Sequence, residues 1–101
     1  MDVTVSIEEY SDLPKKFDLS NNYPNPFNPS TTIKFDLPKN SKVKLSVYNI
    51  LGQEVAVVLN KDLNAGSHEI KFNGLALSSG LYFYKMEAGK FVSIKKMMLI
   101  K

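Results

Sequence analysis

The chain has 101 residues, of which 44% are hydrophobic and 23% charged, and its formal net charge is +3. This length and composition are typical of one globular domain with a modest core, and the lack of cysteine excludes disulfides and thiolate metal sites. All 13 cationic side chains are lysines, whereas arginine is the better ligand for phosphates and base edges, so we expect no binding to nucleic acid.

The first twenty residues are more acidic than the rest, because their carboxylates outnumber Lys15 and Lys16. We interpret residues 1–20 as an upstream linker or first-strand segment, with a candidate strand at 3–7, and residues 21–101 as the domain. The N-terminus lacks the basic flank and apolar run of a signal peptide, and no run reaches the ~18 apolar residues of a membrane span. If exported, the chain is expected to be a piece of a longer precursor.

A proline-rich loop comes next, with the sequence Pro24-Asn25-Pro26-Phe27-Asn28-Pro29. Its prolines lack backbone donors and move the preceding residues out of the helical region, which excludes a helix. The asparagines favour turns. Phe27 is the only large apolar side chain of the six, so we expect it to pin the loop to a core.

The middle of the chain alternates apolar and polar residues, as half-buried strands do. The first alternating run stops at Pro38, which cannot donate to a sheet. After the second run we predict a turn at residues 50–53, where Gly52 would supply a positive φ. A third strand is predicted to direct Val55, Val57 and Leu59 to one side. The predicted inward residues of the first two strands are Ile33, Phe35, Leu37, Val43, Leu45 and Val47.

Two breaks, at residues 64–66 and 73–74, frame a strand with His68, Ile70 and Phe72 on one face. Gly80 opens a strand in which we expect the face of Tyr82, Tyr84 and Met86 to point inward. A hairpin at 88–89 leads to a final strand over about residues 91–100. The pattern predicts an all-β, immunoglobulin-like β-sandwich of about six to seven antiparallel strands.

The last strand breaks the alternation, because residues 97–100 are apolar on both faces. Such a strand is either covered on both sides, for example between its hairpin neighbour and the N-terminal segment, or available to a partner. Its methionines suit an adaptable contact surface. This strand could also support a weak dimer.

The sequence offers no catalytic constellation. His68 is the only histidine, and the pattern predicts a half-buried structural role for it. Ser78-Ser79-Gly80 lacks the flanking glycine of a nucleophile elbow. We therefore expect no enzymatic activity and no cofactor.

Four stretches carry a family resemblance: Asn22-Tyr23-Pro24-Asn25-Pro26-Phe27-Asn28-Pro29-Ser30-Thr31-Thr32-Ile33, Val47-Tyr48-Asn49-Ile50-Leu51-Gly52-Gln53-Glu54-Val55, Leu77-Ser78-Ser79-Gly80-Leu81-Tyr82-Phe83-Tyr84, and Lys96-Met97 with its apolar tail. In this order and spacing they resemble the type A C-terminal sorting domain of type IX secretion, the outer-membrane export route of Bacteroidetes and their relatives. The resemblance implies an immunoglobulin-like sandwich and a non-enzymatic sorting signal.

The resemblance also implies partners and positions. The partners would be the type IX outer-membrane translocon, a sortase-like peptidase that removes the domain, and an upstream cargo domain in the same precursor. The protein would pass through the periplasm and end at the cell surface or in the medium. The matching motif residues are Pro24, Asn25, Pro26, Phe27, Asn28, Pro29, Gly52, Val55, Gly80 and Tyr82. The residues expected to contact the translocon are Lys95, Lys96, Met97, Met98, Leu99, Ile100 and Lys101.

Two other functions remain open at this point. A carbohydrate-binding or adhesive β-sandwich of an extracellular enzyme could use the rings of Tyr10, Tyr48, Phe83 and Tyr84 as stacking platforms. An immunoglobulin-like domain of flagellar hook-capping type looks similar at the Asn-Pro loop and the glycine turns, but has no reason to end on Lys-Met.

Overall fold

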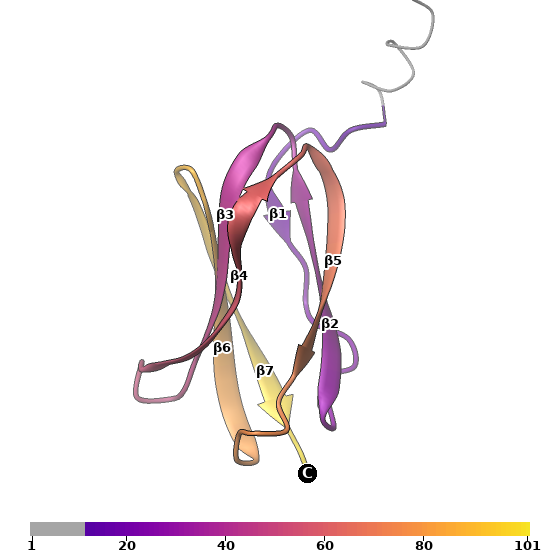
Figure 1. Cartoon of the computed structure of the whole chain (residues 1–101). Coiled ribbons are helices and arrows are strands. Elements are labelled where there is room, and N and C mark those ends of the chain that lie inside the picture. The colour runs from indigo at the N-terminus through magenta and orange to yellow at the C-terminus, as the bar shows by residue number, and fades with distance from the viewer. Residues whose placement is uncertain (1–11) are drawn as a thin grey trace, which may run out of the picture.

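The computed structural model describes residues 12–101, which form an all-β fold with seven antiparallel strands in two facing sheets (Figure 1). The described part contains no helix that could cross a membrane. The predicted fold class is confirmed. The strands are β1 Asp18–Leu19, β2 Ser30–Leu37, β3 Ser41–Tyr48, β4 Glu54–Leu63, β5 Gly66–Asn73, β6 Gly80–Ala88 and β7 Phe91–Leu99.

One sheet has the order β1-β2-β5 and the other the order β4-β3-β6-β7. Neighbours in the sheets are not always neighbours in the sequence, since β2 pairs with β5 and β3 pairs with β6. These crossovers between layers are typical of an immunoglobulin-like sandwich. They leave β4 and β7 as the two outer strands of the four-stranded sheet.

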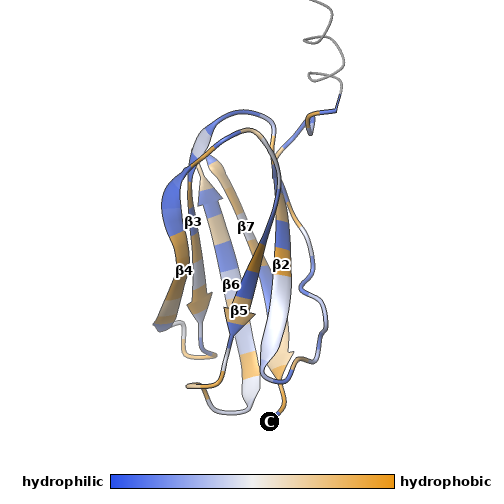
Figure 2. Cartoon of the chain, turned by 45° about the vertical axis from the view of Figure 1, so that its right-hand side comes forward, coloured by the Kyte–Doolittle hydropathy of each residue, from blue (hydrophilic) through white to orange (hydrophobic). Residues whose placement is uncertain are grey.

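The core lies between the two sheets and consists of alternate residues of each strand. Hydrophobic and hydrophilic positions alternate visibly along β6 and β3 (Figure 2). The predicted inward face of β6 is confirmed, because Tyr84 and Met86 are fully buried and Tyr82 is 8% exposed. The other buried apolar residues are Leu19, Phe27, Ile33, Phe35, Leu37, Val43, Leu45, Val47, Phe72, Ala88, Met97 and Leu99.

The prediction for β4 was wrong in one respect. Val55 and Val57 do not share a face with Leu59: they are 37% and 49% exposed, whereas Leu59 packs against the core. Consecutive residues of β3 pair with Leu59 and Val57, so Val58 is an extra residue on β4. Such a bulge interrupts the alternation on which the sequence prediction depended.

The chain enters the sandwich before residue 21. β1 pairs with β2, Leu19 is buried, and the ring of Phe17 stacks on that of Phe91 with centroids 5.4 Å apart. The candidate strand at residues 3–7 lies outside the described residues. His68 is half-buried as predicted, stacked on Phe35 at 5.4 Å with its Nε2 2.8 Å from the carbonyl oxygen of Asn64.

Candidate recognition surface

The proline-rich loop is anchored by Phe27, as expected from the sequence. This side chain is 1% exposed and meets the ring of Phe72 edge to face, with centroids 6.2 Å apart. At the loop entrance, the hydroxyl of Thr31 donates to the carbonyl of Pro24 at 2.9 Å, and the amide of Asn22 donates to the Thr31 hydroxyl at 3.0 Å. The loop is therefore held at both its entrance and its centre.

The same loop binds the end of β7. The segment between β1 and β2 runs along the sandwich to the end where β7 and the C-terminus lie (Figure 1). There the N–H of Phe27 donates to the carbonyl of Met98 at 2.9 Å, and the N–H of Ile100 donates to the carbonyl of Phe27 at 3.0 Å. The side-chain oxygen of Asn25 accepts the N–H of Met98 at 3.0 Å. The loop thus occupies the end of the backbone edge of β7 that β6 leaves unpaired.

The last residues are held from another side by the segment between β5 and β6. The N–H of Lys101 donates to the hydroxyl of Ser79 at 3.0 Å, and its Nζ donates to the carbonyl of Leu75. Gly74 lies directly beneath, where a Cβ would stand 3.1 Å from Leu99 and 3.2 Å from the Phe27 ring. These two side chains therefore leave little room for a side chain at this position.

These contacts divide the tail into two faces. Met97 and Leu99 are fully buried, whereas Met98 is 37% and Ile100 51% exposed. Lys96 and Lys101 are exposed and Lys95 is half-buried. Of the seven residues expected to contact the translocon, two are therefore core residues of the sandwich. Within residues 12–101, β7 pairs with β6 on one side, the end of its other edge binds the proline-rich loop, and its start lies against β1, where the ring of Phe17 stacks on that of Phe91.

Two further motif residues shape turns. Gly52 adopts the expected positive φ, 82°, in the β3–β4 turn, where the side-chain oxygen of Asn49 accepts the N–H groups of Leu51 and Gln53 at 2.9 and 3.0 Å. The hydroxyl of Tyr82 donates to the carbonyl of Ser78 at 2.7 Å, which is the geometry of a tyrosine corner at the start of this strand. Both contacts are structural.

The remaining motif residues lie near the tail or on the surface. Gly80 begins β6 and pairs with Leu99, so it lies beside the docked tail. Val55 lies at the start of β4, on the exposed face described above. The loop residues gather at the tail, whereas Gly52 and Val55 belong to the β3–β4 turn and the strand after it. The motif therefore marks more than one location.

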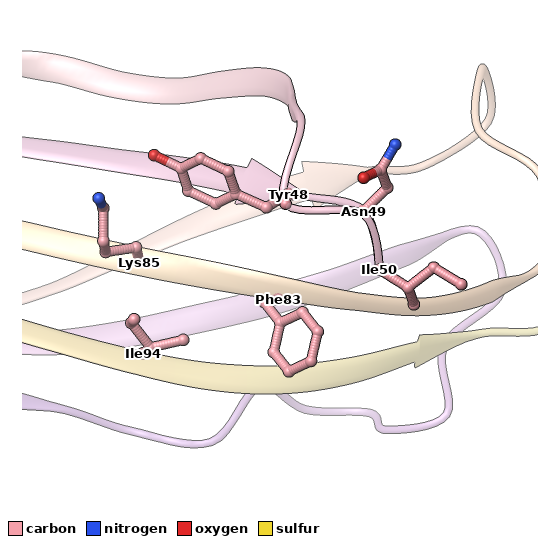
Figure 3. A pocket seen from close by; sticks show the side chains of 7 residues that line it. Tyr48, Asn49, Ile50, Phe83, Lys85 and Ile94 are labelled. Carbon is pink, nitrogen blue, oxygen red and sulfur yellow. The ribbon is translucent and has the colours of Figure 1, made fainter.

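The outer face of the four-stranded sheet is partly apolar next to the tail. Phe83 of β6 pairs with Lys96, and Leu81 pairs with Met98. Next to them is a shallow pocket of about 380 Å³ at the end of β3 (Figure 3). The lining residues are Tyr48, Asn49, Ile50, Gly52, Phe83, Lys85 and Ile94.

Two of the rings proposed for carbohydrate stacking, those of Tyr84 and Tyr48, are already engaged within the domain. Tyr84 is fully buried and its hydroxyl donates to the carbonyl of Ser20 at 2.6 Å; burial raises its pKa to about 12. Lys85 places its Nζ over the Tyr48 ring, 5.2 Å from the ring centre. Tyr10 lies outside the described residues. Within residues 12–101, no three carboxylate or histidine side chains form a group that could hold a metal.

Sequence reasoning missed the contact between the loop and the tail. Asn25 was identified as a motif residue, and the Asn-Gly pair at 73–74 only as the end of a strand. No local pattern could reveal the bond between Asn25 and Met98, because they are 73 positions apart. The only available signal was that the proline-rich loop and the Lys-Met tail belong to one family pattern and both carry groups that can form hydrogen bonds.

Comparisons with known proteins agree with this geometry. A family model described as "Secretion system C-terminal sorting domain" matches residues 21–101. Among solved structures, dimeric latent PorU from Porphyromonas gingivalis contains a similar region, with a TM-score of 0.66 and 19% identity over 84% of this chain and 9% of that chain. At this identity the likeness shows the fold alone, and the match spans a small part of PorU. No curated protein sequence matches the chain significantly.

Proposed function

The chain belongs to the family of type IX secretion C-terminal sorting domains, and we propose that it directs an upstream cargo protein through the outer-membrane translocon. The predicted family is thereby confirmed. Members of this family are sorting signals and not enzymes, and membership implies export to the cell surface or the medium. The cargo, the translocon contact and the later cleavage are our proposals.

The observation that carries the proposal is that buried side chains fix the C-terminal tail while its alternate side chains stay exposed. Met97 and Leu99 are buried in the core, exposed Met98 lies between them on β7, and exposed Ile100 follows directly after the strand. A partner that meets this strand encounters Lys96, Met98 and Ile100 at alternate positions. This spacing gives a short sequence a defined shape and charge, which supports a role as the contact with the translocon.

After passage through the periplasm and the translocon, a sortase-like peptidase would remove the domain, and the cargo would be attached to the surface or released. We place the cleavage upstream of the folded part. Because β1 and the stacked ring of Phe17 belong to the sandwich, a cut before Phe17 leaves its packing intact. The acidic segment ahead of it is the proposed site.

The test is a fusion of residues 1–101 behind a reporter directed to the periplasm of a bacterium with type IX secretion. We expect the reporter at the surface or in the medium. Deletion of Lys96–Lys101 is expected to leave it in the periplasm. Because this deletion also removes two core residues, a second chain ending at Leu99 is compared, which keeps the core and is expected to reduce export. Normal export of both shortened chains would contradict the proposal.

A further inference from the structure

We propose that the loop Pro24–Pro29 is the element that positions the sorting tail, so that the export signal consists of two segments and exists only in the folded domain. This inference rests on the proposed function, in which the tail is read by the translocon. It assigns a role to a loop that does not itself have to touch the export machinery. Asn25 and Phe27 are the positioning residues.

The backbone contacts support this role. The carbonyl and the N–H of Met98 both point away from β6, and so does the N–H of Ile100. Without the loop these groups would face solvent at the end of an edge strand, where pairing frays most easily. Phe27 supplies a donor and an acceptor, and Asn25 supplies the second acceptor. All three groups of the tail are satisfied by the loop.

Side-chain packing holds the same two segments together. Leu99 and the Phe27 ring both approach Gly74 closely, from the tail and the loop respectively. Neither side chain can leave without exposing the other, since both are almost completely buried. The loop and the tail therefore dock as one unit.

Positioning matters because strand side chains alternate. A slip or release of one residue at the end of β7 would turn Met97 or Leu99 outward and Met98 inward. The exposed set of Lys96, Met98 and Ile100 would then be lost, although the sequence of the tail would be unchanged. A partner that binds these three side chains together therefore binds the docked tail and not a released one.

The chain offers well-matched variants of Asn25. Asn25→Ala removes the acceptor for the Met98 N–H, whereas Asn25→Asp keeps an acceptor oxygen in the same place. Asn21 serves as the control, because it is exposed and lines the same side of β7, near Lys96, without a side-chain bond to the tail in the described structure. Asn21→Ala removes the same chemical group nearby.

The experiment measures two quantities on the full chain. In the purified protein, hydrogen exchange at the Met98 amide is compared with exchange at the Leu45 amide of the central strand β3. For Asn25→Ala we expect exchange about tenfold faster at Met98 and unchanged exchange at Leu45. In the reporter fusion, we expect surface delivery of this variant to fall several-fold, while Asn25→Asp and Asn21→Ala behave as the parent chain.

The outcomes separate this inference from the proposed function. Faster Met98 exchange with normal delivery of Asn25→Ala would overturn the inference, as would unchanged Met98 exchange. If exchange also rises at Leu45, the fold itself is lost, and Asn25→Gln, which keeps an amide but displaces its oxygen by one methylene, is tested instead with the same criteria. Normal delivery after deletion of Lys96–Lys101 would instead reject the tail as the signal.

Discussion

The two outer strands of the four-stranded sheet, β4 and β7, differ in what keeps their backbone edges from pairing with another chain. β4 is interrupted by bulges, and its exposed residues include the charged side chains of Glu54, Lys61 and Asp62. β7 is regular and ends in apolar residues, and the proline-rich loop occupies the end of its free backbone edge. Bulges and charges discourage further pairing at an edge. β4 is thus protected from pairing by its bulges and charges. β7 has an uninterrupted register and exposes Lys96 and Met98 on its outer face.

The two edges also differ in how their side chains divide between the core and the surface. The end of β7 combines buried anchors with exposed apolar and basic side chains, so one segment serves both the core and the surface. β4 contributes packing through Val58 and Leu59 and exposes Val55 and Val57. Substitutions at the two edges are therefore expected to have different consequences.

The largest effect is expected for Phe27→Ala. Removal of this buried ring takes away the anchor of the loop and leaves a cavity beside Leu99, at a cost of about 3–5 kcal/mol in the free energy of unfolding. Denaturant titration measures this value. Ile50→Ala, at a residue 69% exposed next to β4, is the control and is expected to change it by less than about 0.5 kcal/mol. Similar values for both would refute the asymmetry between the two edges.

A smaller loss, about 1–3 kcal/mol, is expected for Gly74→Ala, because the added Cβ would press on Leu99 and the Phe27 ring at 3.1 and 3.2 Å. Combination with Leu99→Val, which shortens the opposing side chain, is expected to cost less than the sum of the single changes. Denaturant titration of all four chains gives the interaction energy. Additive losses would mean that the added Cβ at position 74 does not press on the Leu99 side chain.

The segment that leads into the loop can be tested through pH. Burial raises the pKa of the Tyr84 hydroxyl to about 12 in the folded chain, against 10.0 ordinarily. The unfolded chain therefore loses this proton first as pH rises, so the stabilisation is complete below pH 10 and is lost between pH 10 and about 12.

Tyr84→Phe removes this titration along with the bond to Ser20. We expect the variant to be less stable than the parent below pH 10, by about 1 kcal/mol, and the difference to shrink above it. Unfolding titrations across this range measure the difference. A difference independent of pH would show that the hydroxyl does not tie β6 to the segment after β1.

The smallest effect is expected at β4. Glu54 and Lys44 approach to 3.4 Å with side chains more than a third exposed. Glu54→Gln is expected to change the free energy of unfolding by less than about 0.5 kcal/mol, because solvent screens such pairs. Thermal melts at low and high salt measure it. A large, salt-dependent loss would mean that β4 contributes as much to the free energy of unfolding as we expect of the docked end of β7.

Much of this fold follows from local sequence. The strands containing Ile33, Val43 and Tyr84 were predicted because alternation, proline and glycine act over a few residues, and Phe27 was predicted to be buried because its loop offers no other apolar anchor. Which residues of β4 point inward was not predicted correctly, because nothing in the composition indicates a bulge at Val58. The alternation rule holds only for an uninterrupted strand.

The candidate surface was only half predictable. The seven tail residues were predicted together as translocon contacts, which stays a prediction, and only the structure separates buried Met97 and Leu99 from exposed Lys96 and Met98. In a segment apolar on both faces, the sequence contains no alternation that could choose the inward side. That choice is made by tertiary contacts, here with Phe27 and Gly74.

The most direct test compares surface delivery for two double variants of the reporter fusion, with melting temperatures of the purified chains. Lys96→Glu with Met98→Ser alters only exposed side chains of β7, and Val55→Ser with Val57→Ser alters exposed side chains of β4. We predict that the first pair leaves a folded domain in the periplasm and that the second pair is exported normally. Equal export of both folded variants would contradict the claim that the outward face of the docked tail is the signal.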